Sequence, residues 1–195
     1  MKIKIIFLTF VLFIAVSAGC TTQNTKTEPS PAVTPQVTPT NPPETEPDIS
    51  TTASIVADEA AFEKAISSNG SWIICLTRDL TMDKEIVLDG EYTNGKKDDK
   101  GQDIIQRKIA LYSQDDNRNI TKRYTLTAPK LTINSPKASI QHGTFKGDLY
   151  VNAKNFQLID TVVEGNIYFT NKEAQATFEM DEQSKVTGTQ ELIQQ

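Results

Sequence analysis

A segment of strand-forming residues repeats every eighteen positions between residues 131 and 172. The sequence LTINSPKASI (131–140) aligns with LYVNAKNFQL (149–158), and DLYVNAK (148–154) aligns with NIYFTNK (166–172). The alignment has no gap and forms three columns: Leu131, Leu149 and Ile167; Ile133, Val151 and Phe169; Gly147 and Gly165. A short repeat of this kind is typical of a solenoid, in which each coil covers the apolar side of the coil before it. The repeat therefore predicts an all-β solenoid of stacked parallel coils.

Alternation within the repeat predicts which side chains are buried. In FKGDLYV (145–151), Phe145, Leu149 and Val151 fall on one side of the strand, and Lys146 and Tyr150 fall on the other. A shift of one residue would move Lys146 into the core, so the register is well specified. Stacked coils place equivalent residues about 4.8 Å apart. The alignment therefore predicts these outward-facing neighbours: Lys146 with Glu164, Asp148 with Asn166, Tyr150 with Tyr168, and His142 with Asp160.

The segment 54–195 has the length of a single domain. Asp58 and the sequence EAAFEKAI (59–66) predict an amphipathic helix over 58–67, which we expect to cap the first coil. Two polar insertions interrupt the coils at 89–106, with an Asn94-Gly95 turn, and at 113–123, and a shorter one lies at 172–176. Insertions often carry the binding function of repeat proteins. Strands are expected at 71–77, 85–88, 108–112, 124–127, 131–134, 139–141, around 145, and at 149–151, 157–159, 162–163, 167–169, 177–180 and 185–187.

The first nineteen residues have the pattern of a secretory signal peptide. Lys2 and Lys4 precede an apolar run that is shorter than the roughly 20 residues of a membrane span. The following Ser17-Ala18-Gly19-Cys20 resembles the lipobox of bacterial lipoproteins, although Ser17 stands where leucine is commonest. The resemblance implies that Cys20 is lipidated and anchors the chain to the outer face of a membrane. A plain secretory signal, with Cys20 incidental, is the alternative.

Residues 20–53 are predicted to form a disordered linker. Seven of the nine prolines of the chain lie between Pro29 and Pro47, among Thr, Glu, Gln and Asn residues. A segment of this composition cannot bury enough apolar surface to offset its ordering entropy. We expect it to act as a spacer between the membrane anchor and the domain 54–195.

The coil pattern resembles the right-handed parallel β-helix of pectate-lyase-like proteins. The stretch 143–151 and its repeat 161–169 are also similar to bactofilins, polymer-forming β-helix proteins whose repeats combine a glycine, a small polar residue and alternating aliphatic residues. Bactofilin coils are uniform and typically cytoplasmic, whereas this chain has long insertions and a signal peptide pattern. A left-handed hexapeptide helix is disfavoured, because Lys137, Asn155 and Gln157 interrupt a six-residue apolar period.

Tyr150 and Tyr168 are the predicted ligand-binding residues. Both point outward in one column, where aromatic rings on a flat sheet can bind sugar rings. The alternative is cross-strand stacking that only stabilises the sheet. His142, the only histidine, is predicted beside Asp160, as a base would lie beside its orienting group. No suitable nucleophile and no zinc-type ligand set accompany this pair, so no catalytic residue, metal site or cofactor is predicted.

Two other features have a structural interpretation. The run Asp115-Asp116-Asn117-Arg118-Asn119 offers oxygen ligands for calcium but lacks the ligand spacing of an EF-hand loop, so we expect a solvated loop. Cys75 lies in the apolar stretch WIICL (72–76) and is expected to be a buried, unreactive thiol.

The charge and the architecture limit the classes of function. The net charge of −5 argues against nucleic acid as a partner. The sequence predicts a lipid-anchored extracytoplasmic β-solenoid that acts, without catalysis, as a binding or scaffolding module. Expected partners are the membrane, through the lipid, and a polysaccharide or a surface protein. The alternatives are a self-assembling scaffold, growing as a homo-oligomer through an uncovered last coil near Val186, and a minimal polysaccharide lyase or hydrolase.

Overall fold

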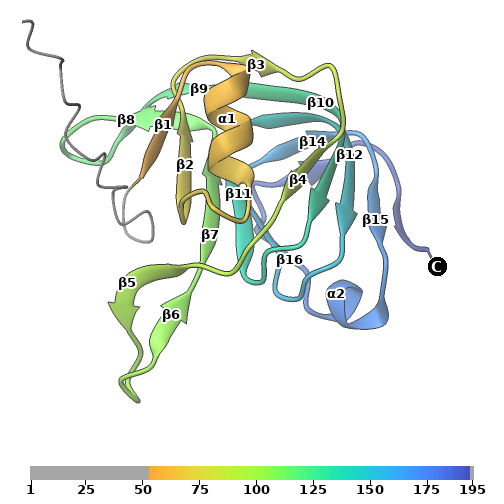
Figure 1. Ribbon diagram of the computed structural model, residues 1–195. Coiled ribbons are helices and arrows are strands. Elements are labelled where there is room, and N and C mark those ends of the chain that lie inside the picture. The colour runs from red at the N-terminus through yellow and green to blue at the C-terminus, as the bar shows by residue number, and fades with distance from the viewer. Residues whose placement is uncertain (1–52, 194–195) are drawn as a thin grey trace, which may run out of the picture. The chain divides into compact units, whose positions relative to one another are not determined.

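The computed structural model describes residues 53–193 (Figure 1). The predicted signal peptide, Cys20 and all but the last residue of the predicted linker lie outside this range. The described part is all-β, as predicted: strands dominate, and its two helices are short, α1 (Glu59–Ile66) and α2 (Lys172–Ala176). Within residues 53–193, no helix has the length and apolar character of a membrane span.

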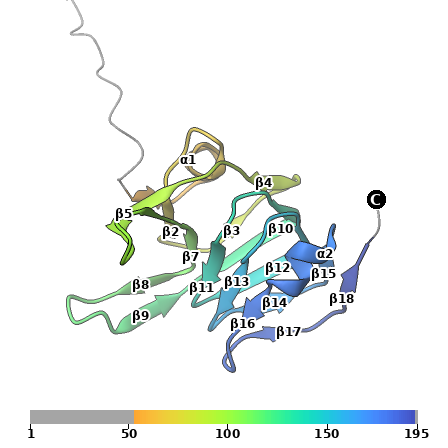
Figure 2. The ribbon, with the colours of Figure 1, turned by 90° about the horizontal axis from the view of Figure 1, so that it is seen from below.

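Most strands belong to two parallel sheets. Sheet A has six strands in the spatial order β1 (Ser54–Val56), β2 (Ile73–Leu76), β7 (Arg107–Ala110), β11 (Ala138–Gln141), β13 (Gln157–Ile159) and β16 (Glu179–Met180). Sheet B has eight: β3 (Leu80–Thr81), β4 (Ile86–Leu88), β10 (Thr125–Ile133), β12 (Thr144–Val151), β14 (Val162–Glu164), β15 (Ile167–Phe169), β17 (Lys185–Val186) and β18 (Gln190–Leu192). The chain alternates between the two sheets along its length (Figures 1 and 2).

The eighteen-residue repeat sets the register of sheet B. Leu131 pairs with Leu149, and Leu149 pairs with Ile167; Ile133, Val151 and Phe169 form the neighbouring column. All six side chains are at most 2 % exposed, so the predicted apolar columns form the core. The predicted outward pairs Lys146–Glu164 and Tyr150–Tyr168 are confirmed by the same register.

Glycine is required where β12 bends between its two halves. Gly147 has a φ of 135°, and a Cβ built on it would lie 1.8 Å from the Ala128 carbonyl oxygen. A Cβ on Gly165 would lie 2.0 Å from the Gly147 carbonyl oxygen, and one on Gly188 would lie 2.6 Å from that of Gly165. The glycine column therefore exists because each backbone passes directly against the one before it.

A ladder of polar side chains follows the glycine column. The Asp148 carboxylate accepts hydrogen bonds from the Asn166 backbone N–H (2.9 Å) and side-chain amide (3.0 Å), which confirms the predicted pair. The Asn166 amide oxygen in turn accepts a hydrogen bond from the Thr189 N–H at 2.9 Å. These bonds satisfy backbone donors at the bend, where the strand pairing is interrupted.

The predicted helix is present as α1 (Glu59–Ile66), and the outer residues of the expected range 58–67 are its caps, Asp58 and Ser67. The Asp58 carboxylate caps α1 by accepting a hydrogen bond from the Ala61 N–H at 2.9 Å. Phe62, Ala65 and Ile66 are buried against the core, and α1 packs on β1, β2 and β4.

Arg107 is a fully buried cation that the sequence pattern does not reveal. It donates hydrogen bonds to the carbonyl oxygens of Ala65 (2.7 Å), Ser67 (3.0 Å) and Asp89 (2.7 Å), and its guanidinium carbon lies 3.9 Å from the centre of the Tyr92 ring. Ala65 and Ser67 lie at the carboxyl end of α1, where unpaired carbonyls and the helix dipole favour a cation. Arg107 thus ties α1 to β7, while burial lowers its pKa.

The two long insertions are antiparallel hairpins rather than irregular loops. The first contains β5 (Thr93–Lys97) and β6 (Asp103–Ile105), and the second contains β8 (Tyr112–Gln114) and β9 (Ile120–Arg123). The predicted Asn94-Gly95 turn is wrong: both residues lie within β5, and the Asp98 carboxylate closes the turn by accepting hydrogen bonds from the N–H groups of Lys100 and Gln102. The short insertion at 172–176 is α2, capped by Asn171.

The strand predictions differ from the structure at several places. The expected strands at 124–127 and 131–134 are one strand, β10, with an irregular register between Thr127 and Lys130. The expected strands around 145 and at 149–151 are likewise joined in β12. Strands β1, β3 and β18 were not predicted, because each has only two or three residues and, unlike the equally short β13, β14 and β15, lies outside the repeated segment 131–172.

Candidate functional site

Tyr150 and Tyr168 lie side by side on the outside of sheet B. Their ring centres are 4.9 Å apart, and the ring planes are inclined by 45°. Both side chains are half-buried. Partial desolvation, followed by the negative charge of Asp148, raises the pKa of Tyr168, so its hydroxyl is a neutral hydrogen-bonding group at neutral pH.

Charged and polar groups border the tyrosine pair. The Lys130 ammonium lies 4.4 Å from the centre of the Tyr150 ring, and its ion pair with Glu85 measures 3.2 Å. On the neighbouring strands of sheet B, Thr132 of β10 pairs with Tyr150, and Glu191 of β18 pairs with Tyr168. The resulting surface combines aromatic faces with hydrogen-bonding groups. We call Tyr150 and Tyr168 the tyrosine pair.

His142 and Asp160 are neighbours, as predicted. The His142 Nδ1 and the Asp160 Oδ2 lie 3.0 Å apart. Both residues have a positive φ, 59° and 47°, at the ends of β11 and β13. Arg123 from β9, which was not foreseen, donates a hydrogen bond to the same carboxylate oxygen at 2.5 Å. This hydrogen bond is the main reason why the pKa of Asp160 is lowered, and the hydrogen bond with His142 adds to it.

Two further residues extend this group along the outside of sheet A. The ring of Tyr112 meets the His142 ring edge to face, with centres 4.6 Å apart and an interplanar angle of 82°. The Lys108 ammonium lies 3.4 Å from the Tyr112 hydroxyl. We call these five residues, Lys108, Tyr112, Arg123, His142 and Asp160, the Tyr112 cluster. It lies at the base of the β8–β9 hairpin.

The aspartates of the second insertion shape its turn. One Asp115 carboxylate oxygen accepts hydrogen bonds from the N–H groups of Asn117 (2.9 Å) and Asn119 (2.8 Å), and the other accepts from the Asn119 side-chain amide (3.0 Å). These bonds lower the pKa of Asp115. In residues 53–193, no group of three or more His, Cys, Asp or Glu side chains is arranged to hold a metal ion.

Cys75 differs from its expected position. It lies on β2 between the buried Ile74 and Leu76, so its thiol points to the outside of sheet A and is half-buried. Burial still raises its pKa, with Lys108 acting in the opposite direction. A thiol with a raised pKa has little thiolate at neutral pH. Cys75 is therefore still expected to be unreactive, although it does not lie in the core.

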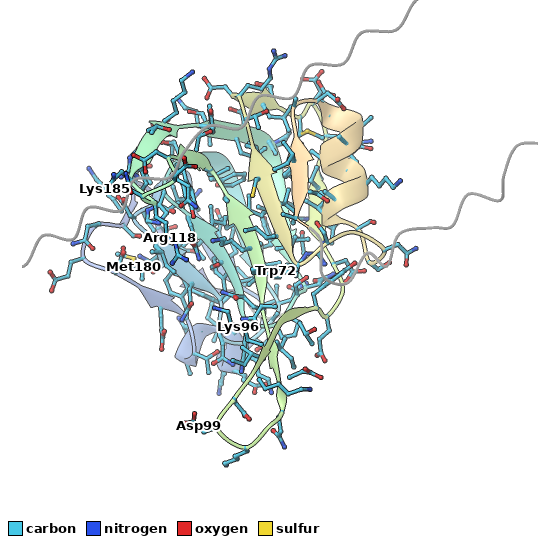
Figure 3. The ribbon with its side chains drawn as sticks, turned by 90° about the vertical axis from the view of Figure 1, so that its left-hand side faces the viewer. Trp72, Lys96, Asp99, Arg118, Met180 and Lys185 are labelled. Atoms are coloured by element: carbon cyan, nitrogen blue, oxygen red, sulfur yellow. The ribbon has the colours of Figure 1, made fainter. Side chains whose placement is uncertain are left out.

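The tyrosine pair and the two long insertions, both expected features of a binding module, lie on two sides of the molecule. The β5–β6 and β8–β9 hairpins project from the side of sheet A, whereas β15, which carries Tyr168, lies on the opposite side (Figures 1 and 2). Figure 3 views the sheet A side, with Lys96 and Asp99 on one hairpin and Arg118 on the other. The tyrosine pair and the hairpins therefore cannot contact the same small ligand.

No protein-family model, curated protein or solved structure matches this chain. Interpretation of both candidate sites therefore depends on their geometry. Sequence reasoning missed Lys108, Tyr112 and Arg123, because a hairpin and a strand pairing bring them to His142 and no short motif links them. A signal existed only for the pair His142–Asp160, which the repeat aligns.

Proposed function

We propose that this chain is a lipid-anchored extracytoplasmic protein whose domain 54–195 is a right-handed parallel β-helix that binds carbohydrate without catalysis. The lipid would be attached to Cys20, and the proline-rich linker would hold the domain away from the membrane. The observation that carries the binding function is the tyrosine pair, two adjacent aromatic rings on the outside of parallel sheet B.

Three features support the β-helix. Strands eighteen residues apart pair in parallel, the chain alternates between sheets A and B, and a single apolar core runs between them. Helix α1 buries Phe62 and Ile66 beside the first strands, as expected of a terminal cap. The right-handed sense follows the general preference of parallel crossover connections.

The chemistry around the tyrosine pair supports a sugar as the ligand. The face of an aromatic ring accommodates the apolar C–H face of a sugar, while polar neighbours fix the hydroxyl groups. The Lys130 ammonium and the Thr132 hydroxyl side chain lie next to Tyr150 in the sheet and can serve this second purpose. Cross-strand contact between the rings stabilises the sheet as well, so stability and binding must be measured separately.

The test uses the full chain and retention on insoluble cell-wall and plant polysaccharides. The variants are Tyr150→Ala, Tyr168→Ala and their combination, with Tyr→Phe at both positions to keep the rings. Val87→Ala, at an exposed position of the same column two strands away from Tyr150, is the control. We expect the double alanine variant to lose retention and the phenylalanine variants to keep most of it. Retention that is equal in the double alanine variant, or absent from the unsubstituted chain, rejects the proposal.

The alternative of a self-assembling scaffold has weaker support. Gln190 occupies the position that Leu149 and Ile167 hold in the preceding strands, and Glu179 and Glu191 are exposed on the last strands. Polar and acidic groups at a sheet edge oppose pairing with another chain. Light scattering should show one species over a wide concentration range, whereas particle growth with concentration would favour the scaffold. For the enzymatic alternative, we expect no product release from pectin-like polymers.

A further inference from the structure

The Tyr112 cluster contains one cation without an ion-pair partner among the described residues. Asp160 pairs with Arg123 and contacts His142 Nδ1, and its backbone N–H donates to the carboxylate of Asp181. Lys108, by contrast, has no carboxylate within 4.0 Å of its ammonium in residues 53–193. A half-buried, unpaired ammonium of this kind favours a single negative charge on a ligand.

Polar side chains of the cluster also have hydrogen-bonding groups without a close partner in the described residues. Among the described residues, His142 hydrogen-bonds only through Nδ1, so its Nε2 has no partner there. The Lys108 ammonium makes one long contact, 3.4 Å to the Tyr112 hydroxyl. Tyr112 lies between these two groups, since its ring contacts His142 and its hydroxyl contacts Lys108. When Nδ1–H donates to the Asp160 carboxylate, the Nε2 of a neutral imidazole is an acceptor. The cluster therefore offers two donors, the Lys108 ammonium and the Tyr112 hydroxyl, and one acceptor, the His142 Nε2.

Two buried polar residues adjoin the cluster. Ser139 and Gln141 lie on the outer side of β11, because Ile140 between them faces the core, yet they are only 2 % and 9 % exposed. The Gln141 amide donates a hydrogen bond to the Ser139 hydroxyl at 3.0 Å. Ser139 pairs directly with Lys108 in the sheet. Neutral groups therefore border Lys108 on this strand, which leaves its ammonium without an ion-pair partner on that side.

We propose that the Tyr112 cluster binds a sugar that carries one monoanionic group, a carboxylate or a sulfate ester. The Lys108 ammonium and the Tyr112 hydroxyl donate to the acidic group, and the His142 Nε2 accepts a hydrogen bond from a sugar hydroxyl. The single charge of Lys108 balances one such group, whereas a phosphate dianion would remain uncompensated. The sugar part of the ligand rests on the proposed carbohydrate binding. The site itself is separate from the tyrosine pair, which lies on the other side of the molecule (Figure 1). A chain with both sites would bind acidic polysaccharides through two faces.

The test uses the single histidine of the chain as its reporter, because the imidazole signals in an NMR spectrum then belong to His142 alone. The full chain is titrated with galacturonate, with galactose 6-sulfate and with galactose. We expect saturable shifts of the His142 signals with one or both of the acidic sugars, which also identifies the acidic group, and no shift with galactose. An equal response to galactose, or no response to either acidic sugar, overturns the inference.

Variants separate this site from the tyrosine pair. Lys108→Met keeps the aliphatic part of the side chain and should weaken acidic-sugar binding on the order of tenfold or more, as expected for the loss of a charge-assisted hydrogen bond. Lys122→Met, at an exposed position of β9 in the hairpin that follows β7, is the matched control and should bind as the unsubstituted chain does. Unchanged amide spectra elsewhere would show that the Lys108→Met chain is folded.

The double variant of Tyr150 and Tyr168 should retain the His142 response. If that response disappears in the tyrosine variant but persists in Lys108→Met, the inference is overturned and binding belongs to the tyrosine pair. If the His142 response is absent while retention on polysaccharides depends on the tyrosine pair, only the proposed function stands. If the response is present and retention is absent, the tyrosine platform fails and the Tyr112 cluster stands.

Discussion

Replacement of glycine by alanine along the column Gly147, Gly165 and Gly188 should destabilise the fold by graded amounts. In Gly165→Ala the new Cβ would lie 2.0 Å from the Gly147 carbonyl oxygen, whereas ordinary contacts begin at 3.4 Å. The two backbones must therefore separate by 3.4 minus 2.0 Å, or 1.4 Å. A separation of this size breaks strand hydrogen bonds worth about 1 kcal/mol each and strains the packed core, so we expect a loss of about 3 kcal/mol or more.

The other two positions give a larger and a smaller loss. Gly147→Ala combines a 1.8 Å contact with a φ of 135°, which is unfavourable for alanine, and should cost at least as much as Gly165→Ala. Gly188 lies just before the edge strand β18, where the nearest backbone oxygen is 2.6 Å away and the chain can shift outward. We expect about 1 kcal/mol there. Gly101→Ala, with a φ of 77° but no atom within 4 Å, measures the conformational cost alone.

Urea unfolding of the four variants provides the measurement. Circular dichroism and the fluorescence of Trp72, the only tryptophan, report on the same transition. The expected order of destabilisation is Gly147→Ala, then Gly165→Ala, then Gly188→Ala. If Gly165→Ala unfolds at the same urea concentration as the unsubstituted chain, the close approach of successive backbones is wrong.

Three further predictions concern the buried cation, the ion pair and the anchor. Arg107→Met should lower the free energy of unfolding by about 3 kcal/mol, because three carbonyls lose their donor and that of Ala65 is buried. Arg78→Met, at an exposed site, should change the free energy of unfolding by less than about 0.5 kcal/mol, and equal losses would contradict the assigned role. The pKa of Asp160 is lower in the folded chain, so its contribution to stability is present above the unfolded pKa and is lost as the pH falls through the folded pKa. Asp160→Asn should therefore be less stable than the unsubstituted chain at pH 7 by up to about 1 kcal/mol, and this difference should vanish in acid. A difference in stability that stays constant with pH would refute the prediction. Cys20→Ser should abolish incorporation of labelled palmitate and release the chain from the membrane fraction, and incorporation that persists would exclude Cys20 as the acceptor.

The sequence predicts the repeated part of the fold well because its information is local. An eighteen-residue spacing and an alternation of period two are sufficient to place Tyr150 beside Tyr168 and His142 beside Asp160. Helix α1 is equally accessible, since Asp58 and an amphipathic segment lie next to each other in the chain. No contact between distant elements is needed for these predictions.

The features that the sequence hides depend on contacts between distant residues. Arg107 bonds to a residue 42 positions away, and a single arginine before a strand carries no sign of this role. Arg123 reaches Asp160 across 37 positions, through a hairpin whose path the repeat does not determine. Cys75 lies in an uninterrupted apolar run, where alternation cannot be seen. Asp115, by contrast, is followed by two asparagines, which could have indicated a turn.

Nuclear Overhauser contacts between backbone protons of β12 and β15 test the parallel arrangement most directly. The account predicts contacts from Leu149 to Ile167, from Tyr150 to Tyr168 and from Val151 to Phe169, a constant separation of eighteen residues. In an antiparallel hairpin the separation would instead change along the strands. Contacts of that second kind would contradict the stacked parallel arrangement on which both binding sites depend.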